Sequence, residues 1–220
     1  MSTMRATSLV WAGLVCAAAS VSTTASAQES KFFDDSWFWG VKSGVATFSP
    51  TLGGNESALS YGAEWLITRS RGALYVSFDQ ANVSSVSAVV DPNTGDGFRP
   101  VSVDKLNRIG VALLAFPKRF GKFRPYAGIG ISLDIVGSAS PMVGVNDQVD
   151  DAVFQRIDDR RSQSGVLGMA GLQMQFERLA VFTQATIIPA QSDFLLSNNV
   201  LGFFEAGVRY NFGTSREGFR

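Results

Sequence analysis

Apolar and polar residues alternate along most of the chain, and a period of two is typical of β-strands, whose successive side chains point to opposite faces. In Val200–Phe212, every second residue from Phe204 onward is apolar or aromatic, and the residues between are small, polar or charged. Similar alternation predicts seven further strands: Ser36–Phe48, Leu59–Thr68, Ala73–Val83, Lys105–Phe116, Arg124–Val136, Gly165–Phe176 and Ala180–Ile188. The last of these is apolar on both faces, so its orientation stays unassigned.

The connections between these predicted strands alternate in length. Three are short, Arg69–Gly72, Pro117–Phe123 and Glu177–Leu179, whereas four are longer and polar, Ser49–Ala58, Ser84–Val101, Gly137–Ser164 and Pro189–Asn199. An even number of strands with short turns on one side and long loops on the other is typical of transmembrane β-barrels. We therefore expect an all-β fold, an eight-stranded antiparallel up-and-down transmembrane barrel with both chain ends on the short-turn, periplasmic side.

The alternation alone also fits a soluble barrel of the lipocalin kind, with its apolar face inward. Two observations favour an apolar face toward lipid. The other face carries many glycines, which suits a narrow, filled interior. Aromatic residues also gather near the predicted periplasmic strand ends, where a belt at the headgroups is expected: Trp37, Trp39, Trp65, Phe116, Phe176, Tyr210 and Phe212.

The first 27 residues have the layout of a cleaved secretory signal peptide. Arg5 supplies the positive start, Leu9–Val21 the apolar stretch, and Ala25-Ser26-Ala27 the cleavage site. The apolar stretch is too short for a membrane-spanning helix, and the residues before Cys16 do not fit lipid attachment. The expected division is residues 1–27 as signal, 28–212 as barrel and 213–220 as a short periplasmic tail.

Composition narrows the function further. The chain has no histidine, and its only cysteine, Cys16, lies in the signal. This disfavours nucleophile–histidine catalysis and histidine-ligated metals, so we expect no enzyme, no catalytic residue, no cofactor and no metal. The 19 basic and 19 acidic residues balance, which argues against a nucleic-acid partner.

Charged residues also occur on the predicted inward face. An eight-stranded barrel is just wide enough to be filled by side chains, so these charges need partners. Lys42 and Glu64 are expected at similar height on neighbouring strands, as are Asp79 and Arg108. The predicted interior polar network is Lys42, Glu64, Asp79, Arg108, Asp134, Glu205 and Arg209. It is interpreted as a satisfied core, with an ion path or a catalytic pair as alternatives.

Two loop segments carry distinct patterns. Asp91–Gly97 has a partial likeness to a calcium loop, but its glycine is misplaced and the closing glutamate is missing, so a hairpin tip is expected. Val149–Arg161 has apolar residues at helical spacing, acids at its start and arginines at its end, which predicts a short helix.

The segments Phe123–Gly130 and Phe204–Phe212 resemble small bacterial outer-membrane proteins of the OmpA/OmpX/OmpW type. The resemblance covers the mature chain and implies the cell outer membrane as location. It also implies that Tyr210 and Phe212 are an assembly signal read by the outer-membrane assembly machinery. Eight residues follow Phe212, whereas that signal usually ends the chain.

The resemblance implies a non-enzymatic role, with outer-membrane lipid and lipopolysaccharide as surroundings and a monomeric protein. One hypothesis is a structural or surface-interaction protein with its specificity in the extracellular loops. The alternative is an OmpW-like passage for small hydrophobic molecules. It requires the inward apolar residues to line one continuous opening: Phe38, Leu66, Leu106, Leu114 and Met169.

Overall fold

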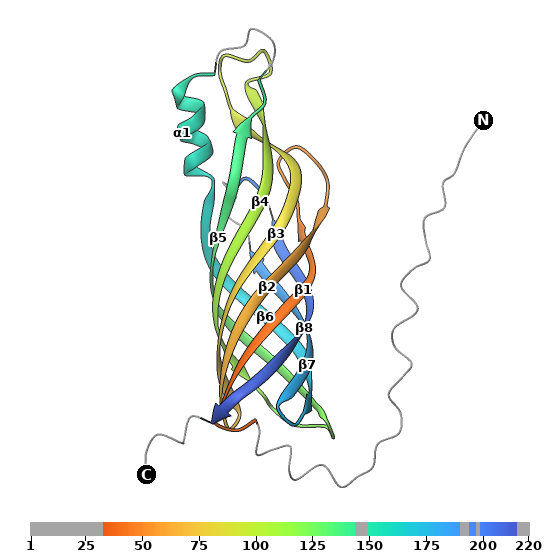
Figure 1. Cartoon of the computed structure of the whole chain (residues 1–220). Helices are drawn as coiled ribbons and strands as arrows, with labels where there is room; N and C mark the ends of the chain where they lie inside the picture. The colour runs from red at the N-terminus through yellow and green to blue at the C-terminus, as the bar shows by residue number, and fades with distance from the viewer. Residues whose placement is uncertain (1–32, 144–148, 190–193, 197–198, 215–220) are drawn as a thin grey trace, which may run out of the picture.

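The computed structural model describes residues 33–143, 149–189, 194–196 and 199–214. Their strands form one closed barrel in which each strand pairs antiparallel with its sequence neighbours and β1 pairs with β8 (Figure 1). The strands are β1 Ser36–Phe48, β2 Glu56–Arg69, β3 Gly72–Val90, β4 Phe98–Ala115, β5 Phe123–Pro141, β6 Ser162–Phe176, β7 Leu179–Pro189 and β8 Val200–Thr214. The eight-stranded antiparallel up-and-down barrel that the alternation predicts is confirmed. The predicted signal peptide and residues 215–220 of the predicted tail lie outside the described residues, and β8 itself continues to Thr214.

The main difference from the predicted elements is the length of β3, β4 and β5. The prediction of Ser84–Val101 as a long polar loop is wrong, because β3 and β4 stay paired as far as Val90 and Phe98. The serines of β3 and Pro100 of β4 make the strand pattern less apolar here. Only Asp91–Gly97 forms the turn, so the hairpin tip is confirmed there, with the Asp91 amide donating to the Gly97 carbonyl at 2.9 Å.

The outward face is apolar and the inward face mixed, as predicted. Trp39, Val41, Ile129 and Ile131 are more than half exposed, whereas charged residues of the opposite face are buried. In β7 the inward residues are Ala180, Phe182, Gln184, Thr186 and Ile188, which settles its orientation. Alternating exposure through the barrel body is the arrangement expected of a barrel whose outer wall faces an apolar solvent.

Six of the seven predicted belt aromatics point outward or lie partly exposed, but Phe116 does not. Its ring is 6% exposed and packs against Phe33 and Tyr126, with ring centroids at 4.8 and 5.4 Å. Phe116 follows Leu114 by two residues and therefore shares that residue's inward face. The aromatic ring closes the short-turn end of the interior.

At the opposite end, β3, β4 and β5 extend past the other strands, and α1 (Asp151–Asp159) lies beside this extension (Figure 1). The helix predicted within Val149–Arg161 is confirmed, with Val153 and Ile157 buried. Leu195 and Leu196 are buried with them in the same apolar cluster. The Ser87 hydroxyl donates to the Leu195 carbonyl at 2.6 Å, which holds this cover against β3. No helix among the described residues is long and apolar enough to cross a membrane.

Candidate functional site

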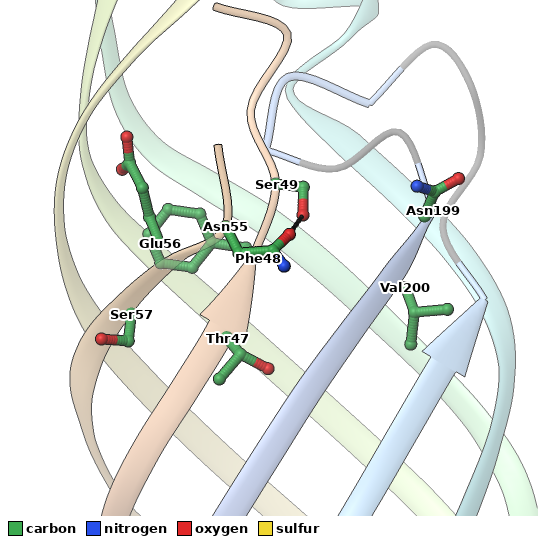
Figure 2. Close-up of a pocket in the computed structure, with 8 residues that line it drawn as sticks. All are labelled: Thr47, Phe48, Ser49, Asn55, Glu56, Ser57, Asn199 and Val200. Carbon is green, nitrogen blue, oxygen red and sulfur yellow. Dashed lines mark hydrogen bonds between the residues drawn. The ribbon is translucent and has the colours of Figure 1, made fainter. Parts of the chain in front are cut away.

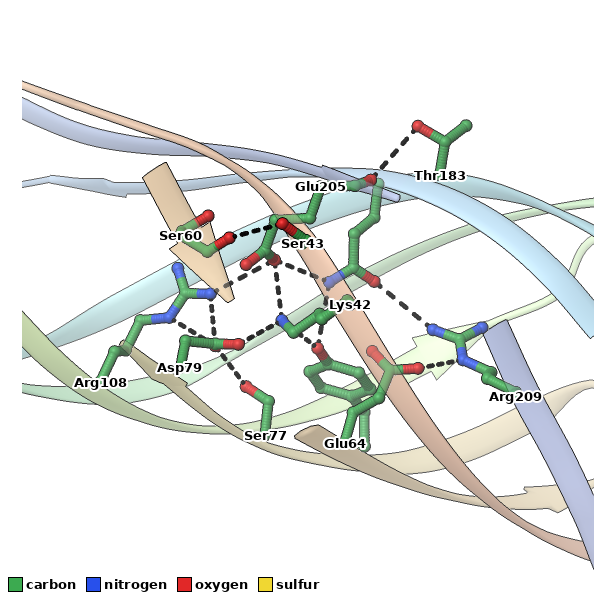
Figure 3. A network of polar contacts seen from close by, with 12 residues as sticks. Lys42, Ser43, Ser60, Glu64, Ser77, Asp79, Arg108, Thr183, Glu205 and Arg209 are labelled. Atoms are coloured by element: carbon green, nitrogen blue, oxygen red, sulfur yellow. Dashed lines mark hydrogen bonds and ion pairs between the residues drawn. The ribbon is translucent and has the colours of Figure 1, made fainter. Parts of the chain in front are cut away.

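Four charged side chains meet in the middle of the barrel (Figure 3). The Lys42 ammonium lies 2.8 Å from Asp79 Oδ1 and 2.7 Å from Glu205 Oε2. The Arg108 guanidinium lies 2.6 Å from Asp79 Oδ2 and 3.6 Å from Glu205 Oε2. Two cations thus share two carboxylates. All four side chains are at most 3% exposed, so the charges are paired in a site shielded from water.

A second ion pair lies closer to the short-turn end. Arg209 Nε donates to Glu64 Oε1, and Arg209 Nη1 donates to Gln173 Oε1 at 2.7 Å. The guanidinium also stacks over Phe182, 3.8 Å from the ring centroid. Arginine suits this place because its planar group can donate in several directions and stack at the same time.

Tyr75, Tyr126 and Gln184 join the two groups into one network. The Tyr75 hydroxyl accepts from Lys42 at 3.0 Å and from Gln184 at 3.1 Å. Gln184 also donates to Glu205 at 3.2 Å, and its oxygen accepts from Tyr126 at 3.1 Å. With these residues and Gln173, the network takes at least one side chain from each of the eight strands.

Two inward glycines explain which charges meet. Gly40 faces Glu64 on β2 and Arg209 on β8, and a Cβ at Gly40 would lie 3.0 Å from the Cγ atoms of both. Gly62 likewise lies between Lys42 and Asp79, and a Cβ there would lie 2.2 Å from Asp79 Oδ1. Because glycine has no side chain, charges two strands apart can reach each other across it.

The structure brings six of the seven predicted network residues together and sets Asp134 beside them. The expected proximity of Lys42 and Glu64 does not produce an ion pair among the described residues, because Gly62, not Glu64, faces Lys42. Asp79 and Arg108 do face each other and pair. Asp134 on β5 faces Arg108 on β4, but its Oδ2 accepts from Ser132 at 3.1 Å and from Gln163 at 3.4 Å.

Four uncharged members of the network were not among the predicted residues: Tyr75, Tyr126, Gln173 and Gln184. Tyr75, Tyr126 and Gln173 alternate with outward apolar residues, so their inward position could have been read from the same pattern. The inward position of Gln184 could not be read in this way, because apolar residues occupy both faces of its strand. Within the described residues there is no cluster of three acidic, cysteine or histidine side chains able to hold a metal ion.

The barrel end with the long loops carries a polar cleft of about 530 Å³ (Figure 2). It lies between the β1–β2 connection and the start of β8, and Thr47, Ser49, Asn55, Glu56 and Asn199 are among the residues that line it. The Ser49 hydroxyl donates to Asn55 Oδ1 at 2.7 Å, which braces one wall. Phe48 forms part of the floor and is 2% exposed.

The hairpin tip holds an ion pair of its own. Arg99 Nε donates to Asp91 Oδ2 at 2.6 Å, and the Asn93 amide donates to Asp91 Oδ1 at 3.0 Å. The hydrogen bond from Arg99, with that from Asn93, holds the pKa of Asp91 below its ordinary value. The carboxylate is thus occupied by groups of its own hairpin.

No protein-family model matches the chain, and no curated protein sequence matches it significantly. Among solved structures, Neisserial surface protein A is similar with a TM-score of 0.56 and 16% identity, over 80% of this chain and 97% of that one. Ail, the attachment invasion locus protein of Yersinia pestis, is similar with a TM-score of 0.51 and 10% identity, over 82% and 100% of the two chains. These likenesses show a shared fold. The resemblance to small outer-membrane barrels is therefore confirmed at the level of the fold.

Proposed function

We propose that this chain is a non-enzymatic, integral outer-membrane β-barrel with a structural or surface-interaction role, whose specificity lies in the loops at the extended end. The observation that carries the proposal is the network of paired charges that crosses the interior and draws on every strand. A barrel filled in this way leaves its outer surface and its loops as the parts that meet other molecules.

The outer wall supports a membrane location. Exposed aliphatic and aromatic side chains surround the barrel, and the sheet closes on itself, so the backbone has no open edge where it would meet hydrocarbon. Of the two proteins with similar folds, one is named a surface protein and the other an attachment invasion locus protein. These names support a surface role here.

In this proposal the short-turn end faces the periplasm, and the β3–β4 hairpin, α1 and the polar cleft face outward. Tyr210 and Phe212 fit the role of assembly signal, because both rings point outward near the end of β8 and contact each other at 5.1 Å. The outer-membrane assembly machinery would read them before the barrel closes. The protein is then a monomer, and lipid and lipopolysaccharide surround its outer wall.

The alternative, passage of small hydrophobic molecules, has less support. The five inward residues it relies on are each at most 5% exposed: Phe38, Leu66, Leu106, Leu114 and Met169. They fill the interior as packed side chains, and the network lies on the same inward face. Their burial favours filling over an open path.

Electrical recording tests the proposal directly. The mature protein, refolded and inserted into a planar bilayer, is expected to show no steady conductance, because buried ion pairs block the interior. A difference in gel migration between boiled and unboiled protein would first establish that the barrel is folded. Steady conductance, or uptake of a hydrophobic probe into vesicles that depends on the protein, would overturn the closed-barrel proposal in favour of the passage.

A further inference from the structure

The two ends of the barrel differ in charge. At the short-turn end, the described residues at and beside the turns include six cations and three acids: Arg69, Arg71, Lys118, Arg119, Lys122 and Arg178, against Asp34, Asp35 and Glu177. At the extended end acids outnumber cations: Glu56, Asp91, Asp96, Asp104, Asp150, Asp151, Asp158 and Asp159, against Arg99, Lys105, Arg156, Arg160 and Arg161. The excess of positive charge is thus confined to the short turns.

Two of these cations lie against aromatic rings. Lys118 Nζ lies 6.0 Å from the centroid of Phe120, and Lys122 Nζ lies 5.7 Å from the centroid of Phe176. Phe176 ends β6 on the outward face and is 40% exposed, so the Lys122 ammonium lies at the height of the outer aromatic belt. That is the height of lipid headgroups around a membrane barrel.

The β4–β5 turn that carries these lysines has a defined backbone. The Phe120 amide donates to the Phe123 carbonyl at 2.8 Å, and the Phe123 amide donates back at 3.0 Å. Gly121 between them has a φ of 59°, which favours glycine. Lys118 and Lys122 therefore project from a fixed turn, which lowers the entropy cost of binding a ligand.

A cleft of about 260 Å³ lies between this turn and the β2–β3 turn. Four basic residues line it, Arg71, Lys118, Arg119 and Arg124, together with Ser70 and the acidic Asp34. The Phe116 amide donates to the Arg71 carbonyl at 2.7 Å and ties the two turns together. With four basic residues against one acid, the cleft has an excess of positive charge that suits the oxygens of a phosphate, because guanidinium and ammonium groups both donate to them.

We propose that this cleft binds the phosphate of an anionic phospholipid in the leaflet that surrounds the short turns. Arg71, Lys118 and Ser70 contact the phosphate oxygens, and Lys122, over the Phe176 ring, lies at the height of the neighbouring headgroups. Charge complementarity and the adjoining aromatic belt favour a lipid headgroup over a protein partner. The inference rests on the proposed function, since it needs a barrel embedded in a bilayer.

The test measures lipid retention by the mature protein in nanodiscs that contain equal amounts of phosphatidylglycerol and phosphatidylcholine. Native mass spectrometry of the released protein gives the ratio of the two lipids that stay bound. A cation near a membrane surface contributes about fivefold to the binding of an anionic lipid. We expect the wild type to prefer phosphatidylglycerol. The variant that combines Arg71→Gln with Lys118→Gln loses two cations, and its preference should fall about fivefold for each.

The matched control combines Lys105→Gln with Arg160→Gln, which removes the same charge from the extended end. This control variant is expected to keep the wild-type preference for phosphatidylglycerol. Equal retention of both lipids by the wild type, or the same loss in both double variants, overturns the inference. The heat-dependent gel shift separates the two proposals: a folded, inserted barrel without lipid preference counts against the phosphate site alone, whereas failure to insert counts against the membrane barrel itself.

Discussion

The barrel interior and the hairpin tip both contain buried ion pairs, but they are built in different ways. In the interior, Lys42 pairs with Glu205, 163 positions away in the chain. At the tip, Arg99 pairs with Asp91, only eight positions away. The interior pairs therefore depend on closure of the whole sheet, whereas the tip pair needs only one hairpin. We expect loss of an interior charge to weaken the whole barrel and loss of the tip pair to loosen the tip alone.

The largest effect is expected from Lys42→Met. This change leaves Asp79 and Glu205 to share Arg108 in a site shielded from water, and breaking a buried ion pair costs about 3–5 kcal/mol. Urea unfolding of the protein in lipid vesicles, followed by tryptophan fluorescence, gives the free energy of unfolding. The control Lys105→Met alters an exposed lysine and is expected to change it by less than about 0.5 kcal/mol. Equal effects of the two changes would show that the interior pairs do not stabilise the barrel.

A smaller effect is expected from Gly62→Ala, which tests whether the space at this glycine allows Lys42 and Asp79 to meet. The new methyl group would lie 2.5 Å from the Phe78 carbonyl oxygen as well as close to Asp79. Overpacking of this kind costs about 1–3 kcal/mol. Gly168→Ala is the matched control, since a Cβ there meets nothing within 4 Å. If both variants unfold at the same urea concentration, the gap at Gly62 is not needed for the Lys42–Asp79 contact.

These residues also show what could be predicted from the sequence. Alternation located the strands and gave β1 its observed bounds, because lipid and a filled interior impose opposite residue types on the two faces. It could not orient β7, where apolar residues occupy both faces, and it missed the extension of β3 and β4, whose serines and Pro100 resemble loop residues. Alternation set the charged residues on the inward face, but it did not show that Gly62, rather than Glu64, faces Lys42. Which charged side chains pair depends on the stagger between neighbouring strands, and the pattern within one strand does not give that stagger.

The smallest expected effect concerns the tip and its response to pH. The pKa of Asp91 is lowered from 3.8 in the folded protein, so the stability that its ion pair contributes is present above pH 3.8 and is lost as the pH falls through the lower, folded pKa. Hydrogen exchange of amides in Asp91–Gly97 should therefore accelerate on acidification through this window, beyond the intrinsic pH effect. Asp91→Asn should remove that extra acceleration. An unchanged profile in this variant would assign the pH response to another group.

The glycine gaps have a consequence for the seam between β1 and β8, the pairing that closes the cylinder. A slip of two residues is the smallest that keeps inward side chains inward. In one direction it would set Lys42 directly opposite Arg209, two like charges shielded from water. In the other it would set Lys42 opposite its partner Glu205 but Arg209 opposite Phe38. Both slips take Arg209 away from Gly40, the gap through which it reaches Glu64, so this ion pair helps to fix the register in which the barrel closes.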